Sequence, residues 1–106
     1  MPRLLKETFK AWRDEMPGAN HKLIVTGELE VPTSGWKAEL TPKKPPGINP
    51  TILMLDVDAH APQGIVNQIV QKLPLRYEQA DTTGSYKQVT VLYGSDSVTV
   101  DVKPVH

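Results

Sequence analysis

The sequence predicts a mainly β protein, an antiparallel two-sheet sandwich of six to seven strands with a short N-terminal amphipathic helix. Apolar and polar residues alternate along most of the chain, as they do in strands with one buried face and one solvated face. Proline and glycine interrupt these runs every ~8–12 residues, the spacing at which turns recur in sandwiches. We therefore expect an immunoglobulin-like or fibronectin-like topology.

The N-terminal segment has a different pattern from the rest of the chain. Four of its apolar residues recur at helical spacing: Leu5, Phe9, Trp12 and Met16. With Pro17 and Gly18 as a stop signal, this spacing predicts an amphipathic helix over residues 3–16. We expect residues 1–18 to form a helical extension, which covers one end of the sheet or docks on a partner, and residues 19–106 to form a single β-sandwich domain.

The next segment predicts two strands, over residues 23–31 and 36–40, joined by a turn from Pro32 to Gly35. In the first strand the alternate residues are apolar: Leu23, Val25, Leu29 and Val31. Two alternating runs on either side of a proline and glycine turn predict a β-hairpin. Trp36 shares the apolar face of the second strand, which favours a core position for its indole.

Residues 41–50 contain four prolines, and proline fixes φ and removes backbone donors. We expect this segment to be an extended surface connection between the two sheets. Pro42 and Pro45 also have the PxxP spacing of ligands for proline-recognising domains, which is the alternative role for this segment.

Residues 51–59 predict a strand, followed by a turn over residues 60–64. Its expected inner face carries Leu53, Leu55, Val57 and Ala59. Residues 65–73 fit one face of a helix, but their apolar residues are mainly β-branched and lie between Gly64 and Pro74. We expect a strand there, with a helix as the alternative.

Three further alternating runs predict strands: residues 75–78, 86–93 and 98–102. Residues 81–85 predict a loop, and a turn from Gly94 to Asp96 closes the strand before it. Tyr77 is expected to hydrogen-bond backbone at a corner between the sheets.

The composition excludes several kinds of chemistry. The chain has no cysteine, so it holds no disulfide, thiolate nucleophile or cysteine-based metal site. Its 12 basic and 12 acidic residues give a net charge of zero, whereas nucleic-acid binders carry an excess of positive charge. We therefore expect no binding of nucleic acid.

No apolar run reaches the ~20 residues of a membrane-spanning helix, and the charged N-terminal residues do not resemble a signal peptide. By default these features predict a cytoplasmic protein without membrane insertion. Lys22, Glu28 and Glu30 discourage pairing between sheet edges, so the expected state is a monomer or a weak dimer.

Asp56, Asp58 and His60 alternate along a predicted strand and into its end, so their side chains emerge on one face with successive Cα atoms ~6.6 Å apart. Carboxylates and imidazole bind divalent metals, so these residues are the candidate ligands should a metal bind. The favoured interpretation is a solvated sheet face without a metal, and no cofactor is expected. The chain also contains no nucleophile elbow and no phosphate-binding loop.

The stretch Pro32-Thr33-Ser34-Gly35-Trp36 resembles the N-P-T-T-G-[YF] loop of chagasin-type inhibitors of papain-like cysteine peptidases, which are also disulfide-free sandwiches. Val31 stands where that family has Asn, and neither its glycine-rich second loop nor its Arg-Pro-[WF] third loop has a counterpart here. The resemblance implies binding through four residues: Thr33, Ser34, Gly35 and Trp36.

Because the chain lacks a catalytic set, the leading hypothesis is a non-enzymatic β-sandwich that binds another protein through loops at one end or through an exposed sheet face. The loop from Thr33 to Trp36 is the candidate binding site. One alternative is a cysteine peptidase inhibitor that uses this loop. The second is a metal-binding or metal-dependent protein that uses Asp56, Asp58 and His60.

Overall fold

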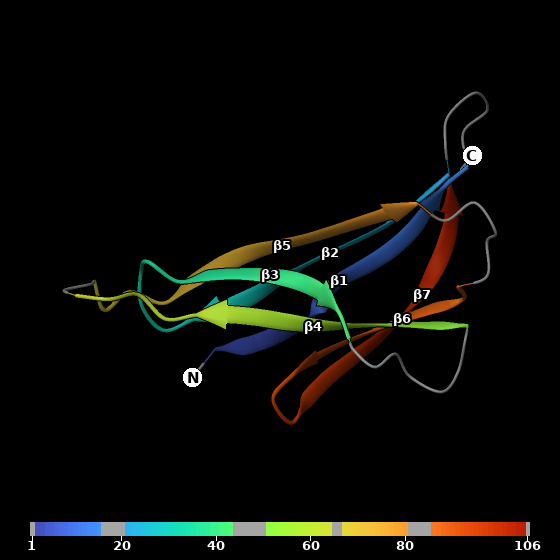
Figure 1. The fold of residues 1–106 in the computed structure, drawn as a ribbon. Coiled ribbons are helices and arrows are strands. Elements are labelled where there is room, and N and C mark those ends of the chain that lie inside the picture. The colour runs from blue at the N-terminus through green and yellow to red at the C-terminus, as the bar shows by residue number, and fades with distance from the viewer. Residues whose placement is uncertain (1, 16–20, 44–50, 65–66, 81–85, 106) are drawn as a thin grey trace.

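In the computed structural model, the regular structure of the described residues is entirely β, and seven strands form one mixed sheet (Figure 1). The described residues are 2–15, 21–43, 51–64, 67–80 and 86–105. The strands are β1 (Arg3–Asp14), β2 (Lys22–Val31), β3 (Lys37–Pro42), β4 (Ile52–His60), β5 (Gln71–Ala80), β6 (Gln88–Tyr93) and β7 (Asp96–Val105). Their order in the sheet is β3-β4-β6-β7-β1-β2-β5.

The predicted mainly β class is confirmed, but the structure is not a clear antiparallel two-sheet sandwich. The neighbours β1 and β7 are parallel, as are β4 and β6, and the other neighbours are antiparallel. The sheet curls until its edge strands β3 and β5 contact each other, so the fold is nearly barrel-like. Among the described residues there is no helix with the length and hydrophobicity needed to cross a membrane.

Strand β7 joins two halves of this sheet. Its residues 96–101 pair with β6, and its residues 102–105 pair with β1. Strands β1, β2 and β5 therefore form one half, and β3, β4 and β6 form the other. This division of one strand between two neighbours makes the seven strands a single sheet.

The core lies between the two halves, where alternate residues of the strands point inward. The predicted inner face of β4 is confirmed, since Leu53, Leu55 and Val57 are buried and Ala59 packs against them. The inner face of β2 is confirmed in the same way. The whole cluster of buried core residues is Leu4, Phe9, Ala11, Leu23, Val25, Leu29, Val31, Leu40, Leu53, Leu55, Val57, Leu75, Val89 and Val91.

At the end of the core away from the 32–36 turn, Arg13 of β1 is hydrogen-bonded to the segment that leads into β6. Arg13 is buried, and its Nη2 donates to the Tyr86 carbonyl at 2.6 Å while its Nη1 lies 3.5 Å from Glu15 Oε1. The Tyr77 hydroxyl donates to Gln79 Oε1 at 2.7 Å, not to backbone as predicted. Burial, and to a smaller extent Tyr86, raises the pKa of the Tyr77 hydroxyl.

The predicted N-terminal helix is wrong, because residues 3–14 form β1, which lies inside the sheet between β7 and β2. The pairing of β1 with β2 shifts between Leu5 and Lys10. Four residues of β1 bulge there opposite Gly27 alone: Lys6, Glu7, Thr8 and Phe9. The spacing of Leu5 and Phe9, which resembles a helical turn, comes from this bulge.

Two side-chain features hold the bulge. The Thr8 hydroxyl donates to the Leu5 carbonyl at 2.6 Å and accepts from the Glu28 N–H at 2.9 Å. The ring of Phe9 packs on Gly27 so closely that a Cβ at this glycine would overlap it. The bulge therefore depends on one hydroxyl and on one absent side chain.

Two other predictions about strand pairing and extent are also wrong. Strand β2 pairs on both sides, with β1 and β5, so it forms no hairpin with β3, which pairs with β4. Of the strand predicted over residues 65–73, residues 67–70 lie outside any strand, residues 71–73 belong to β5, and residues 65–66 lie outside the described residues. Strand β5 runs from Gln71 to Ala80 through Pro74. Proline is tolerated there because β5 is an edge strand.

Strands β4, β6 and β7 confirm the strands predicted from their sequences. β6 and β7 form a hairpin through Gly94 and Ser95, in which Gly94 has a φ of 58°. Parts of three predicted segments lie outside the described residues. These are Met16 with the helix stop, residues 44–50 of the proline-rich connection, and the 81–85 loop.

We expect Gly27→Ala to destabilise the protein by about 1–3 kcal/mol, because the new methyl group collides with the Phe9 ring. The φ of Gly27 is not positive, so the cost reports packing rather than backbone strain. Urea denaturation of the variant measures it. In a Phe9→Leu background the same change should cost less, and an equal cost in both backgrounds would contradict the contact.

We expect Thr8→Val to destabilise the protein by about 1–3 kcal/mol, because the Glu28 N–H and the Leu5 carbonyl lose their partner. Valine keeps the shape of threonine, so the loss is specific to the hydroxyl. Thr8→Ser is the matched control and should stay closer to the wild type in thermal unfolding. Equal melting temperatures for the two variants would show that the hydroxyl does not hold the bulge.

Candidate functional site

Two connections between strands meet at one end of the molecule, at the left of Figure 1. Residues 32–36 link β2 to β3, and residues 61–70 link β4 to β5. Val31, the last residue of β2, pairs with the first residue of β5, and Lys37, the first residue of β3, pairs with the last residue of β4. All four strand ends therefore lie together. We call the described residues of the two connections, 32–36, 61–64 and 67–70, the loop tip.

The two connections are bound to each other by backbone and side-chain hydrogen bonds. The Ser34 N–H donates to the Asn67 carbonyl at 3.1 Å, and the Asn67 N–H donates to Ser34 Oγ at 3.2 Å. This reciprocal pair fixes the start of the 67–70 segment on the 32–36 turn. Gly35 has a φ of 86°, a conformation that glycine adopts without strain, and this allows the turn to close.

The predicted binding loop from Thr33 to Trp36 lies within the loop tip, but its tryptophan is turned inward. The indole Nε1 of Trp36 donates to Thr33 Oγ1 at 3.1 Å, and its ring is half-buried against the core. Thr33 and Ser34 are also half-buried, whereas Gly35 is exposed. Trp36 thus supports the turn, and the exposed part of the loop is small.

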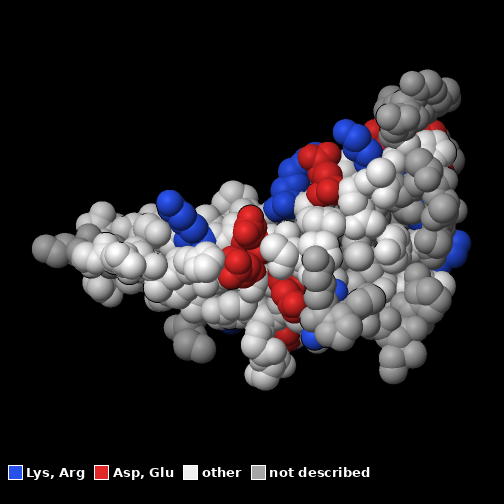
Figure 2. Space-filling model, viewed as in Figure 1, with Lys and Arg blue, Asp and Glu red and all other residues white. Residues whose placement is uncertain are grey.

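The largest exposed apolar side chains of the described residues lie in the second connection. Ile69 is 57% exposed and Val70 is 63% exposed. Neither residues 32–36 nor residues 61–70 include a charged residue. Figure 2 shows accordingly that few charged side chains gather at the left end of the molecule, in contrast to the middle of this face. The loop tip is an uncharged surface with an apolar pair at its base.

The predicted metal candidates lie beside the loop tip on β4, but not as a set. His60 Nε2 is 3.1 Å from Asp58 Oδ1, and both side chains are exposed. Asp56 lies further along β4, opposite Thr41. Within the described residues, no three carboxylate or imidazole side chains are placed to hold one metal ion. The structure brings two of the three candidates into contact.

Residues of both predicted sites line one shallow pocket of about 510 Å³. It joins the binding-loop candidates to the end of the metal-candidate strand, and its lining is Ser34, Gly35, Lys37, His60, Ala61, Pro62 and Gln63. The sequence reasoning missed Asn67, Ile69 and Val70, because it placed their segment in a strand. A signal was present in the lack of clean alternation from residue 65 to residue 73.

We expect Ser34→Ala to loosen the loop tip without unfolding the sheet, because the Asn67 N–H loses its acceptor. Amide hydrogen exchange measured by NMR should show about fivefold or greater acceleration at Asn67, consistent with about 1 kcal/mol of lost local stability. Ser95→Ala, in the β6–β7 turn, is the control and should leave this amide unchanged. Unaltered exchange at Asn67 in the Ser34 variant would contradict the reciprocal bond.

The loop tip thus combines two mutually bound connections, an inward tryptophan and an exposed apolar pair. Its polar neighbours on β3 and β4 are Lys37, Asp58 and His60. The chain matches no protein-family model, no curated protein and no solved structure.

Proposed function

We propose that this protein is a non-enzymatic binding module that engages another protein through the loop tip. The observation that carries the proposal is the exposure of Ile69 and Val70 at 57% and 63%. Apolar β-branched side chains are costly to leave in water, and burial of their exposed part in a complex contributes about 1–2 kcal/mol each. A partner surface that covers them gains affinity from this burial.

The backbone around the apolar pair favours binding, because little of it has to be ordered when a complex forms. Asn67 is fixed by Ser34 on one side, and Gln71 begins the ladder with β2 on the other. Ile69 and Val70 therefore lie on a short span between two fixed points. Pre-ordered contact residues reduce the entropy that binding costs.

The charge distribution describes the surface that the partner should present. The loop tip itself has no charged residue, while Lys37, Asp58 and His60 flank it. A central apolar contact with a polar rim is the usual organisation of a protein interface. We therefore expect an uncharged apolar patch on the partner, bordered by polar groups.

We expect Ile69→Asn/Val70→Asn to weaken partner binding by about tenfold or more, because the apolar contact is lost from the centre of the interface. Both side chains are exposed, so the variant should fold with the wild-type melting temperature. The test uses wild type and variant as parallel baits in cells of the source organism. A protein retained by wild type is then purified, and calorimetry measures its affinity for both baits.

Thr99→Asn is the matched control, because Thr99 is exposed on β7 and outside the loop tip. It should bind the partner as the wild type does. Equal affinity of the Ile69/Val70 variant and the wild type would contradict the proposal. Loss of a self-association seen in the wild type by sedimentation would instead identify a second copy of this chain as the partner.

A further inference from the structure

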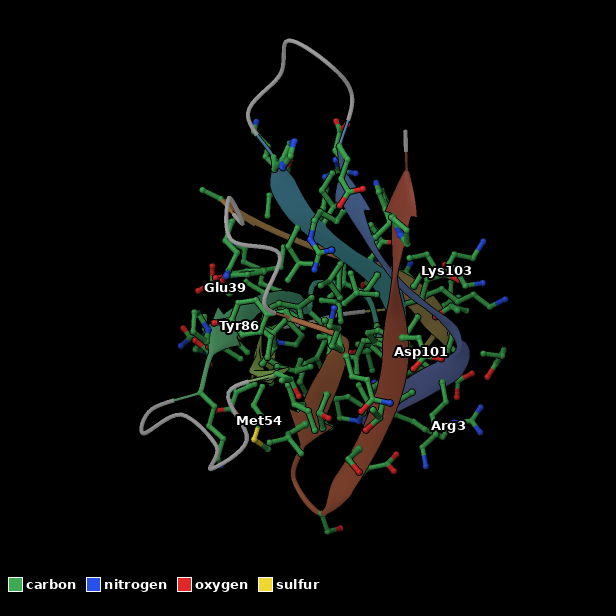
Figure 3. The ribbon with its side chains drawn as sticks, turned by 90° about the vertical axis from the view of Figure 1, so that its right-hand side faces the viewer. Arg3, Glu39, Met54, Tyr86, Asp101 and Lys103 are labelled. Atoms are coloured by element: carbon green, nitrogen blue, oxygen red, sulfur yellow. The ribbon has the colours of Figure 1, made fainter. Side chains whose placement is uncertain are left out.

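Neighbouring strands β1 and β7 pair along only part of their length. Their ladder runs from Ala11 and Val102 to the C-terminal ends of both strands. Before this ladder β1 contains its bulge, and β7 pairs with β6 alone. Figure 3 shows β1 and β7 separating on the side of the molecule that carries Asp101 and Lys103.

The two strands are joined again at the other end of this separation. Lys6 Nζ lies 2.8 Å from Asp96 Oδ1, and this hydrogen bond lowers the pKa of the Asp96 carboxyl. The separation is therefore closed by a backbone ladder at one end and by an ion pair at the other. We call this opening in the sheet, between β1 residues 6–11 and β7 residues 96–102, the β1–β7 window.

A pocket of about 560 Å³ lies at the end of the window next to the ladder and extends over the Trp12–Lys103 pair. Its volume is within the ~300–1,000 Å³ typical of small-molecule sites. Its floor consists of inward-facing residues that belong to the core or pack against it: Phe9, Ala11 and Val100. Its rim consists of residues at the alternating, outward positions of the same strands: Lys10, Trp12, Asp101 and Lys103. An apolar floor thus lies beneath a charged rim.

The charge of the rim is positive and only partly compensated. Within the described residues, the ammonium groups of Lys10 and Lys103 have no ion-pair or hydrogen-bond partner, and both residues are exposed. The Asp101 carboxylate is engaged by Gln88, whose Nε2 donates to it at 3.1 Å. Two exposed lysines whose ammonium groups have no partner in the described residues therefore line the pocket, together with the half-buried Trp12.

We propose that the β1–β7 window binds a small amphipathic anion, with a ring-sized apolar body on the floor and its anionic group between Lys10 and Lys103. The apolar body lies against the half-buried Trp12 indole and Val100, above Phe9 and Ala11, which are only 5% and 4% exposed. The closed ends of the window favour such a compact ligand over an added strand, which needs an edge open at both ends. This site is separate from the loop tip.

The probe is 1-anilinonaphthalene-8-sulfonate, an aromatic sulfonate, titrated into the full chain and followed by its own fluorescence and by NMR. The chain has two tryptophans, so two indole N–H signals are expected, and Trp36→Phe assigns them. Binding in the window shifts the Trp12 signal and leaves the Trp36 signal in place. A shift of Trp36 alone, or of Ile69 and Val70, would overturn the proposal.

A charge-removing variant tests the role of the rim. We expect Lys10→Gln/Lys103→Gln to weaken binding of the sulfonate by about fivefold to tenfold, as two exposed charge contacts allow. Lys72→Gln/Lys87→Gln is the matched control, because it removes the same charge from exposed lysines outside the pocket lining. Equal weakening by both variants would mean that net charge, rather than the window, attracts the probe.

An uncharged analogue, 1-anilinonaphthalene, separates the head group from the apolar body. It should bind the wild type less tightly than the sulfonate, and Lys10→Gln/Lys103→Gln should not change its affinity. Tighter binding of the uncharged dye than of the sulfonate would overturn the assignment of an anionic ligand. Ile69→Asn/Val70→Asn should leave both affinities unchanged, and a loss in this variant would place the dye on the loop tip instead.

Discussion

The pairing of β7 with two neighbours is the constraint on which the rest of this fold depends. Strand β7 pairs with β6 through residue 101 and with β1 from residue 102, so it leaves one neighbour where it joins the other. This pairing makes β1 and β7 parallel neighbours and joins the two halves of strands into one sheet. The bulge of β1 occurs beside the stretch of β7 that belongs to β6. The window between these strands is thus a product of the same constraint.

The loop tip is likewise a result of topology rather than of any local motif. The chain crosses from one half of the sheet to the other after β2 and crosses back after β4. Both crossings occur at the same end, because Val31 lies opposite Gln71 and Lys37 lies opposite His60. Residues that are more than thirty positions apart, such as Ser34 and Asn67, are thereby brought within hydrogen-bond distance. Hydrogen bonds between such residues join the two connections in a chain that has no cysteine.

The sequence was sufficient to predict the core-facing residues of two strands but not those of β1, nor most of the pairings between strands. Alternation identified the inner faces of β2 and β4, since each strand has its own period of two. Pairing depends on residues far apart in the chain, so the parallel neighbours and the absent β2–β3 hairpin were beyond local patterns. Because of the bulge, Leu5 and Phe9 have the spacing of a helix. The only local sign of the close contact between Phe9 and β2 was the glycine at position 27 within a strand pattern. At the site, the Thr33–Trp36 turn was anticipated, whereas Ile69 and Val70 had been assigned to a strand.

The contact between the edge strands β3 and β5 has a consequence for partial unfolding. No ladder joins these two strands in the described residues, so side chains alone close the sheet there. Opening along this line exposes two strand edges together, and free edges recruit other chains into aggregates. Pro74 within β5 and Pro42 at the end of β3 each remove an amide donor from those edges. If the contact between β3 and β5 opens, each exposed edge therefore carries a proline that hinders its pairing with a strand of another chain.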